Sequence, residues 1–185
     1  MKKIKQIVTI FAALALAVTA GLSFAGTKTK AAGSDEFTRT AIEIAADMGY
    51  GWNLGNTMEA TNTWTSNPKV TDFETAWGQP VTTKAMIDGI KKAGFNSIRI
   101  PVSWSNMMSS DGNYTIDASY FKRVDEIISY AFANDMYVII NDHYDGGWWE
   151  HFCGNKRDCM KHYKNMWTQV AGHYKNYSEK LIFES

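Results

Sequence analysis

Short apolar runs alternate with amphipathic helical stretches along most of this chain, and that order constrains the fold more than any other feature. Apolar residues at helical spacing cover 83–93, and Gly94 ends the helix. Apolar runs at 96–102 and 136–140 have the composition of strands buried in a sheet. Strands and helices that alternate in this way predict an α/β protein with a parallel sheet.

Further elements extend the alternation, and the loops between them favour one type of α/β fold. No glycine-rich phosphate loop follows any strand, which disfavours a nucleotide-binding sheet. Long loops at 57–80 and 143–157 instead favour a (β/α)8 barrel, whose site lies at the carboxyl ends of the strands. Because such a barrel needs about 250 residues, we expect a barrel truncated after about three βα units and the start of a fourth strand. The other elements expected are a helix at 35–48, a strand at 50–56, helices capped by Asp117 and by Asp158, and a strand at 181–183.

The first residues have the pattern of an export signal. Three lysines at positions 2, 3 and 5 precede an uncharged run from Ile7 to Ala25 that ends in small residues. This pattern predicts a signal peptide over 1–25, a flexible leader over 26–34, and secretion, which leaves 35–185 for the incomplete barrel. An uncleaved membrane anchor is the alternative, because the run is nearly long enough to span a bilayer. Cleavage leaves 16 basic and 19 acidic residues, so neither nucleic acid nor a membrane surface is expected as a partner, and no obligate protein partner is implied.

Polar and aromatic side chains follow the predicted strands. Arg99 lies between two isoleucines, where a guanidinium needs a carboxylate, so it either orients a catalytic carboxylate or forms a structural ion pair. His143 either hydrogen-bonds a sugar hydroxyl or an active carboxylate, or it is a structural histidine. Tryptophan rings suit the apolar faces of sugars, although each of them could belong to the core instead. The candidate substrate-binding residues are Trp52, Asn53, His143, Tyr144, Trp148 and Trp149.

Other chemistry receives less support from the sequence. Cys153 and Cys159 are candidates for a short-loop disulfide in a secreted chain, or they remain free. Together with nearby histidines they could be offered as a zinc site, but CxxC and HExxH patterns are lacking, so no metal and no cofactor is expected. Asp142 and Glu150 could form an acid–base pair, but nothing in their spacing requires one, and a solvated loop is the simpler interpretation.

Three segments resemble glycoside hydrolase family 5, and most of all its bacterial endoglucanases. They are WNLGNT at 52–57, FNSIRIPVSW at 95–104 and VIINDH at 138–143, in the order and at the spacing of that family. The resemblance covers nearly all of residues 36–185, and it implies that 35–185 is the N-terminal part of a catalytic domain of that family, here incomplete. It implies a (β/α)8 barrel that hydrolyses β-1,4-glucan with retention, by two glutamates and without a metal. In that chemistry one acid protonates the leaving oxygen and the other forms a covalent intermediate, their carboxyls about 5–5.5 Å apart.

The resemblance also implies roles for particular residues. Arg99 matches the family's arginine near the nucleophile, His143 matches its histidine beside the sugar, and Trp52 and Asn53 match its first-strand motif. The acid/base glutamate belongs to an Asn-Glu pair just past the fourth strand, and the nucleophile to the seventh strand. Neither is expected in this chain, since Glu184 precedes that pair, so the chain alone is expected to be inactive.

Two departures from the family's pattern concern substrate specificity. Tyr144 stands where many endoglucanases have a second histidine, and Asp142 stands where the family often has an apolar residue. A mannanase or xyloglucanase specificity, or a non-catalytic relative that only binds glycan, therefore remains an alternative to an endoglucanase.

Overall fold

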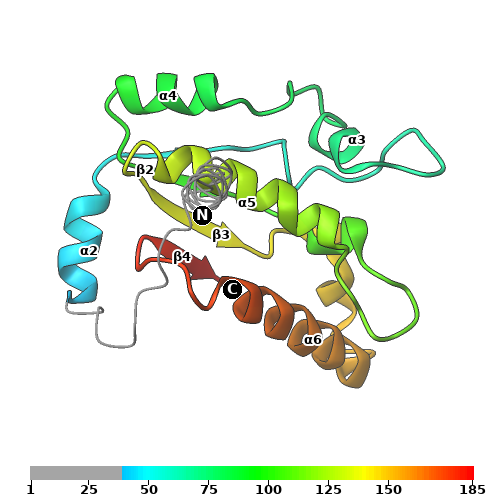
Figure 1. The fold of residues 1–185 in the computed structure, drawn as a ribbon. Coiled ribbons are helices and arrows are strands. Elements are labelled where there is room, and N and C mark those ends of the chain that lie inside the picture. The colour runs from blue at the N-terminus through cyan, green and yellow to red at the C-terminus, as the bar shows by residue number, and fades with distance from the viewer. Residues whose placement is uncertain (1–38) are drawn as a thin grey trace, which may run out of the picture. The chain divides into compact units, whose positions relative to one another are not determined.

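Four parallel strands form a single sheet in the computed structural model, which describes residues 39–185 (Figure 1). Each strand is hydrogen-bonded to the next one along the chain, in the order β1-β2-β3-β4. The predicted α/β order and parallel sheet are therefore confirmed, as part of an α/β barrel. The predicted signal peptide and leader lie outside the described residues. The strands are β1 (Gly51–Asn53), β2 (Ser97–Ile100), β3 (Tyr137–Asn141) and β4 (Leu181–Glu184).

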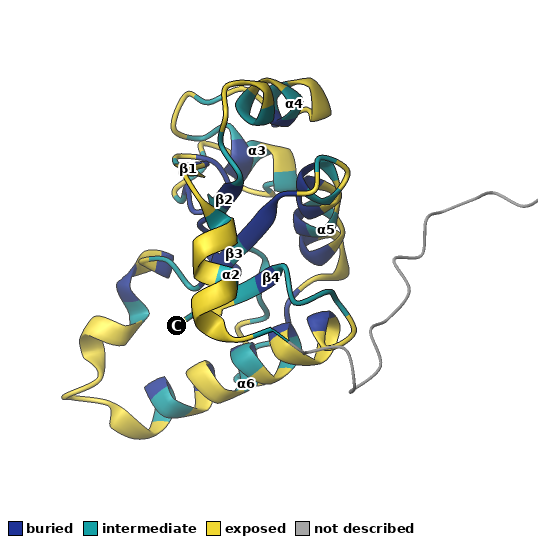
Figure 2. Cartoon of the chain, turned by 90° about the vertical axis from the view of Figure 1, so that its left-hand side faces the viewer, coloured by how far each residue is buried: buried dark blue, intermediate teal, exposed yellow. Residues whose placement is uncertain are grey.

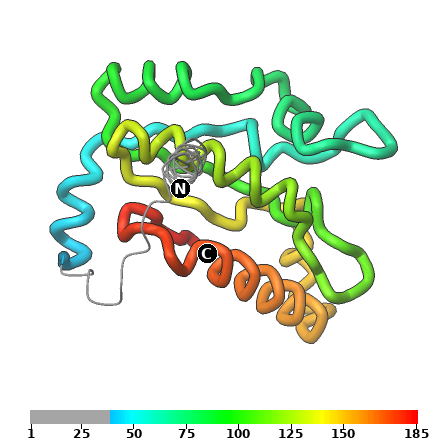
Figure 3. Tube along the Cα trace, in the orientation of Figure 1, coloured from blue at the N-terminus to red at the C-terminus, as the bar shows by residue number. Residues whose placement is uncertain are grey.

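A helix precedes each strand, so the trace runs repeatedly from strand to helix and back (Figure 3). Asp117 caps the helix before β3 as predicted, because its carboxylate accepts a hydrogen bond from the backbone N of Ser119. The helices are α2 (Ala41–Met48), α3 (Val70–Glu74), α4 (Lys84–Lys92), α5 (Ala118–Phe132) and α6 (Lys156–Tyr174), with 3-10 helices η1 (Trp104–Met107) and η2 (Asp145–His151).

Two helices begin at other residues than the sequence predicts. α2 begins at Ala41, because Thr40 and Glu43 form a capping box: Glu43 Oε2 accepts from Thr40 N at 2.6 Å, and Thr40 Oγ1 accepts from Glu43 N at 3.3 Å. α6 begins before the predicted cap Asp158, and Asn155 occupies its N-cap position. The short helix α3 lies inside a segment predicted to be a loop.

One face of the sheet contributes to the hydrophobic core (Figure 2). Its side chains have no exposed area and pack in one cluster with apolar residues of α5 and α6. Truncating such a residue to alanine costs about 2–5 kcal/mol. The members that define this face are Ile98, Ile100, Val138 and Ile140 from the strands, Val124, Ile127 and Ile128 from α5, and Met166 and Val170 from α6.

The other face of the sheet carries polar side chains toward the carboxyl ends of the strands. The register places Asn53 beside Arg99 and Asn141 beside Glu184. At the opposite end of the sheet, Arg39 Nη1 donates to Tyr137 Oη at 2.6 Å. α2 follows Arg39 and has no buried residue (Figure 2). Within residues 39–185, no helix combines the length and the apolar character needed to cross a membrane.

Candidate functional site at the carboxyl ends of the strands

An arginine–glutamate pair joins β2 to β4 at the carboxyl end of the sheet. Arg99 Nε donates to Glu184 Oε2 at 2.7 Å, and Arg99 Nη2 donates to Glu184 Oε1 at 2.6 Å. This two-point geometry holds the carboxylate in a fixed plane. The side chain of Arg99 is 27% exposed and that of Glu184 is 43% exposed, so the pair faces solvent rather than the core.

Two asparagines complete the ring of polar groups around that pair. Arg99 Nη1 donates to Asn53 Oδ1 at 2.9 Å, which brings in β1. Asn141 Nδ2 donates to Glu184 Oε1 at 3.1 Å, and its own Oδ1 accepts from Val102 N at 3.2 Å. Each of the four strands therefore contributes one side chain to a single hydrogen-bonded group. We call Asn53, Arg99, Asn141 and Glu184 the strand-end cluster.

His143 lies next to the strand-end cluster. Its Nδ1 is 3.5 Å from Arg99 Nη2 and 3.5 Å from Asn141 Nδ2. Because both of these neighbours are donors, Nδ1 is placed as an acceptor, and the ring carries a proton on Nε2. That Nε2–H is then available to a ligand hydroxyl. The structure thus brings together three residues that the sequence singled out, Asn53, Arg99 and His143.

The electrostatics of the cluster favour an ionised carboxylate. The hydrogen bonds from Arg99 lower the pKa of Glu184, and Asn141 and the arginine's charge act in the same direction. The same pairing raises the pKa of Arg99. Glu184 therefore remains an acceptor near neutral pH. It does not have the raised pKa that a general acid requires.

An exposed pair of aromatic rings lies in the loop that follows β3. Tyr144 is 50% exposed and Trp149 is 46% exposed. Trp149 Nε1 donates to Tyr144 O at 3.0 Å, and the two rings meet edge to face at 6.3 Å. Tyr144 directly follows His143, the histidine that lies next to the strand-end cluster. We call Tyr144 and Trp149 the aromatic platform.

Two tryptophans predicted to bind sugar lie elsewhere. Trp148 turns into the base of its loop, where its ring stacks on His162 at 4.1 Å and its Nε1 donates to Asp145 at 3.0 Å. Trp52 packs edge to face against Phe95 at 5.3 Å. In register, Trp52 pairs with the core residue Ile98, so it lies on the other face from Asn53. The structure brings neither ring to the strand-end cluster.

In the same loop Asp145 is buried and Asp142 is partly buried, contrary to the solvated loop expected for Asp142. Burial raises the pKa of Asp142, and the nearby charge of Asp145 raises it further. Oδ1 of Asp142 is buried and has no hydrogen-bond partner among the described residues. Burial also raises the pKa of Asp145. Glu150 is exposed, so Asp142 and Glu150 do not share one environment.

Of the two alternatives that the sequence left open for the cysteines, the structure has the one without a disulfide. Cys153 and Cys159 are both free: Cys153 is exposed in the turn before α6, and Cys159 is buried within α6. The Cys159 thiol donates to Trp148 O at 3.5 Å, which directs its sulfur toward the loop. In the part of the chain that the structure describes, no three His, Cys, Asp or Glu side chains come together as metal ligands.

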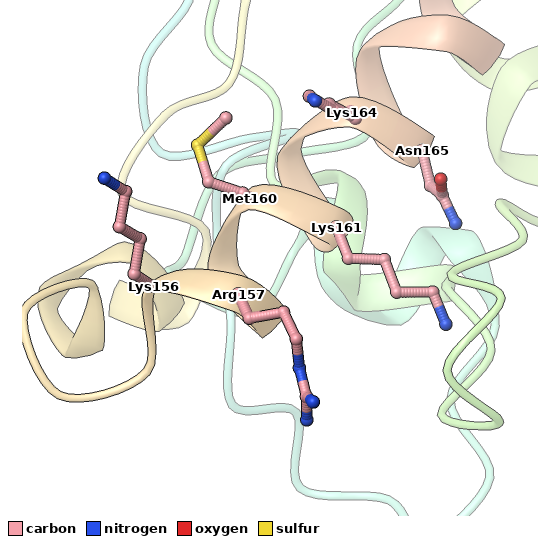
Figure 4. A pocket seen from close by; sticks show the side chains of 6 residues that line it. All are labelled: Lys156, Arg157, Met160, Lys161, Lys164 and Asn165. Atoms are coloured by element: carbon pink, nitrogen blue, oxygen red, sulfur yellow. The ribbon is translucent and has the colours of Figure 1, made fainter.

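A separate hollow lies along α6 (Figure 4). It contains none of the residues of the strand-end cluster or the aromatic platform, and it is strongly basic. A neutral sugar offers no charge that such a surface would recognise, so we do not assign the hollow to a neutral glycan. Its lining is Lys156, Arg157, Met160, Lys161, Lys164 and Asn165.

The sequence did not assign a site role to Asn141 or Glu184. Both lie in the last position of a parallel strand, which is the signal that could have identified them. Glu59, another polar residue after the first strand, was also given no specific role. It is buried, and its carboxylate accepts hydrogen bonds from the backbone N of Asn56 at 2.5 Å and of Thr57 at 2.9 Å, which fixes the loop after β1.

Comparisons with known proteins agree on one family. The family model described as Cellulase (glycosyl hydrolase family 5) matches residues 58–185. Endoglucanase A of Paenibacillus barcinonensis is 43% identical over 180 residues, which are 94% of this chain and 44% of that protein. Endoglucanase A of Clostridium longisporum is 46% identical over 148 residues, 80% of this chain and 28% of that protein.

Solved structures give the same result. A GH5-4 broad specificity endoglucanase from Ruminococcus champanellensis with bound cellotriose matches with a TM-score of 0.74 and 43% identity. The match covers 78% of this chain and 42% of that one. The chain thus spans less than half the length of these relatives.

Proposed function

Because this chain belongs to glycosyl hydrolase family 5, the cellulase family, we propose that it is the N-terminal part of a secreted, retaining hydrolase of β-1,4-glucan. The strand-end cluster and His143 would bind the sugar next to the bond that is cleaved, and the aromatic platform would stack on a neighbouring sugar ring. The printed descriptions of the relatives support this substrate, since they are endoglucanases and one of them holds cellotriose.

The observation that carries the proposal is the strand-end cluster itself. Arg99 and Asn141 hold one ionised carboxylate at 2.6–3.1 Å, and Asn53 accepts from Arg99 at 2.9 Å, on a face of the sheet that stays open to solvent. Fixed amide, carboxylate and imidazole groups offer both donors and acceptors to sugar hydroxyls. The role of these groups is to bind and orient the substrate.

We propose further that the 185-residue chain does not hydrolyse glucan by itself. Retaining hydrolysis needs an acid with a raised pKa and a second carboxylate as nucleophile. Glu184 has a lowered pKa and is held by Arg99, so it lacks the proton that the leaving oxygen needs. A reducing-end assay on carboxymethyl cellulose is expected to give no product. Turnover that disappears in Glu184→Gln would contradict this assignment.

The aromatic platform has a direct test with a matched control. Trp149→Ala is expected to weaken the binding of cellotetraose to the chain about five- to tenfold, because one ring–sugar contact is lost. Trp64→Ala is the control, since Trp64 is 98% exposed in the loop after β1 and lies outside the site. Isothermal titration calorimetry measures both variants. Equal losses in Trp149→Ala and Trp64→Ala would refute the platform.

A panel of oligosaccharides tests which polysaccharide the protein binds. Binding of cellotetraose in preference to mannotetraose and to a xyloglucan oligosaccharide supports a β-1,4-glucan substrate. A preference for either of the others would reassign the specificity to mannan or xyloglucan. The inferred export signal is tested by N-terminal sequencing of the protein recovered from culture medium, and retention of residue 1 would contradict cleavage.

A non-catalytic glycan-binding protein is the second candidate, and the exposed platform favours it as much as it favours an enzyme. The coding sequence beyond Ser185 distinguishes the two. An Asn-Glu pair within a few codons, followed by further βα units, supports the hydrolase. A stop codon there, together with glucan binding by the purified chain, supports the binding protein.

A further inference from the structure

A buried polar cluster lies behind the aromatic platform and plays no part in the proposed chemistry. Asp145 is 3% exposed, and its carboxylate accepts three hydrogen bonds. The donors are Ser105 N at 2.8 Å, Ser105 Oγ at 2.6 Å and Trp148 Nε1 at 3.0 Å. His162 Nε2 lies 3.1 Å from the same Ser105 Oγ. We call Ser105, Asp145, Trp148 and His162 the loop clasp.

The loop clasp connects three separate segments of the chain. Ser105 belongs to η1, Asp145 and Trp148 belong to η2, and His162 belongs to α6. The His162 ring is held between two aromatic rings, with Tyr114 at 4.4 Å on one side and Trp148 at 4.1 Å on the other. Burial lowers the pKa of His162, so the ring in this stack is neutral at pH 7. The clasp is therefore a packed unit around the single carboxylate of Asp145.

The loop clasp holds a backbone segment whose φ angles are unfavourable for most residues. Four successive residues have positive φ: Tyr144 at 21°, Asp145 at 51°, Gly146 at 71° and Gly147 at 72°. Glycine adopts such angles freely, but tyrosine and aspartate do so at a cost. A strained run of this kind persists only where surrounding contacts determine it. The hydrogen bonds of Asp145 supply those contacts.

The strained run also sets the position of the sugar-facing rings. Tyr144 is its first residue, and Trp149 follows its end by two residues. Gly147 N donates to Tyr144 O at 2.8 Å, and Trp149 Nε1 donates to the same oxygen at 3.0 Å. The platform thus depends on the loop conformation, and the loop conformation depends on the clasp.

We propose that Asp145 is a positioning residue, which fixes the left-handed loop after β3 through Ser105 and Trp148 and thereby places Tyr144 and Trp149 to stack on the glucan chain. That the ligand of these rings is a glucan rests on the proposed function, whereas the role of Asp145 in holding the loop does not. Because Asp145 is 3% exposed and held by Ser105 and Trp148, its role is to position the loop and not to contact the sugar.

Ser105→Ala and Asp145→Asn test the proposal, with Ser109→Ala as the matched control. Ser109 Oγ also donates to an aspartate, Asp111, at 2.7 Å, but that bond is exposed and far along the chain from the platform. Hydrogen exchange of residues 144–152 is expected to become about tenfold faster in the first two variants, because a buried hydrogen bond of the loop is lost. Exchange in β2 and β3 is expected to stay unchanged, and Ser109→Ala is expected to change neither segment.

Affinity separates a positioning role from a general loss of stability. Ser105→Ala is expected to weaken cellotetraose binding by about the same factor as Trp149→Ala, and the double variant by no more than either one, because both act through the same ring. Factors that multiply in the double variant would overturn the proposal, as would unchanged loop exchange in Ser105→Ala. If the unaltered chain binds no cello-oligosaccharide, the proposed function fails, and loop exchange still decides whether Asp145 holds the loop. Ser105→Ala retains the backbone donor, so it keeps the test available if Asp145→Asn does not fold.

Discussion

Two arginine–glutamate pairs with the same two-point geometry occupy different places in this molecule. Arg123 of α5 binds Glu74 of α3 through Nε at 2.8 Å and Nη2 at 2.7 Å. Arg99 binds Glu184 across the sheet through Nε at 2.7 Å and Nη2 at 2.6 Å. In the first pair the Arg123 side chain is 11% exposed and the Glu74 side chain 0% exposed. In the second pair the two side chains are 27% and 43% exposed.

The neighbours of each pair explain what it does. Glu74 also accepts from Thr82 N at 2.7 Å, and Arg123 donates to Thr82 O at 2.7 Å. Backbone groups therefore shield the first pair from solvent, and we call it the closed pair. The second pair meets amide and imidazole side chains and then solvent. An ion pair closed by backbone groups joins structural elements, whereas one that remains open at the strand ends can bind a ligand. Burial and neighbours, and not the pair itself, separate the two roles.

The largest expected effect is on the closed pair. Arg123→Met leaves the carboxylate of Glu74 buried without its guanidinium, and such a loss costs about 3–5 kcal/mol of unfolding free energy. Urea unfolding measures it. The control is Glu126→Gln, which removes the 50%-exposed partner of Arg123 and is expected to cost less than about 1 kcal/mol. Similar losses of unfolding free energy in the two variants would show that burial does not decide how much an ion pair of Arg123 contributes.

Asp142 is partly buried and its Oδ1 has no hydrogen-bond partner among the described residues, and its contribution to stability depends on pH. In the unfolded chain it ionises near pH 4, while in the folded chain its raised pKa retains the proton to higher pH. The folded state therefore loses stability as pH rises above about 4. Asp142→Asn cannot ionise, so it is expected to raise the melting temperature at pH 7 and to change it little at pH 4. Asp111→Asn should show the opposite sign at pH 7, because hydrogen bonds lower the pKa of Asp111.

A smaller effect on stability is expected at the open pair. Arg99→Gln removes the charge that lowers the pKa of Glu184, so that pKa should rise toward its ordinary value. The stabilisation from a lowered carboxyl pKa is present above the unfolded value and is lost as pH falls. The variant should therefore lose about 1 kcal/mol or less at pH 7, and match the unaltered chain at low pH. An NMR titration of the Glu184 carboxyl measures the pKa, and an unchanged value would contradict the assigned cause.

The pattern of apolar residues was sufficient to predict the sheet. It failed to predict the start of a helix where polar side chains determine that start. The strand runs at 96–102 and 136–140 contain β2 and β3, because burial on both faces leaves a continuous apolar pattern. The start of α2 depends on the capping box of Thr40 and Glu43, which competes with the longer apolar spacing. The segment 57–80 hides α3, because a helix of five residues has too few apolar positions for a period.

The site was predicted in part for the same reason. An arginine inside an apolar strand identified Arg99, and the polar residues at the end of β3 identified His143. Which face a tryptophan takes depends on register and on its neighbours, so Trp52 and Trp148 could not be told apart from Trp149 in the sequence alone. The loop clasp was also out of reach, because Ser105, Asp145 and His162 meet only through the tertiary fold.

Titration of the isotope-labelled chain with cellotriose tests the central claim most directly. We expect saturable chemical-shift changes in the side-chain amides of Asn53 and Asn141, the Nε–H of Arg99 and the indole N–H of Trp149, with the indole of Trp64 unchanged. Shifts confined to other surfaces, such as the basic hollow of α6, or no saturable shift at all, would contradict the assignment of the strand-end cluster as the glucan site.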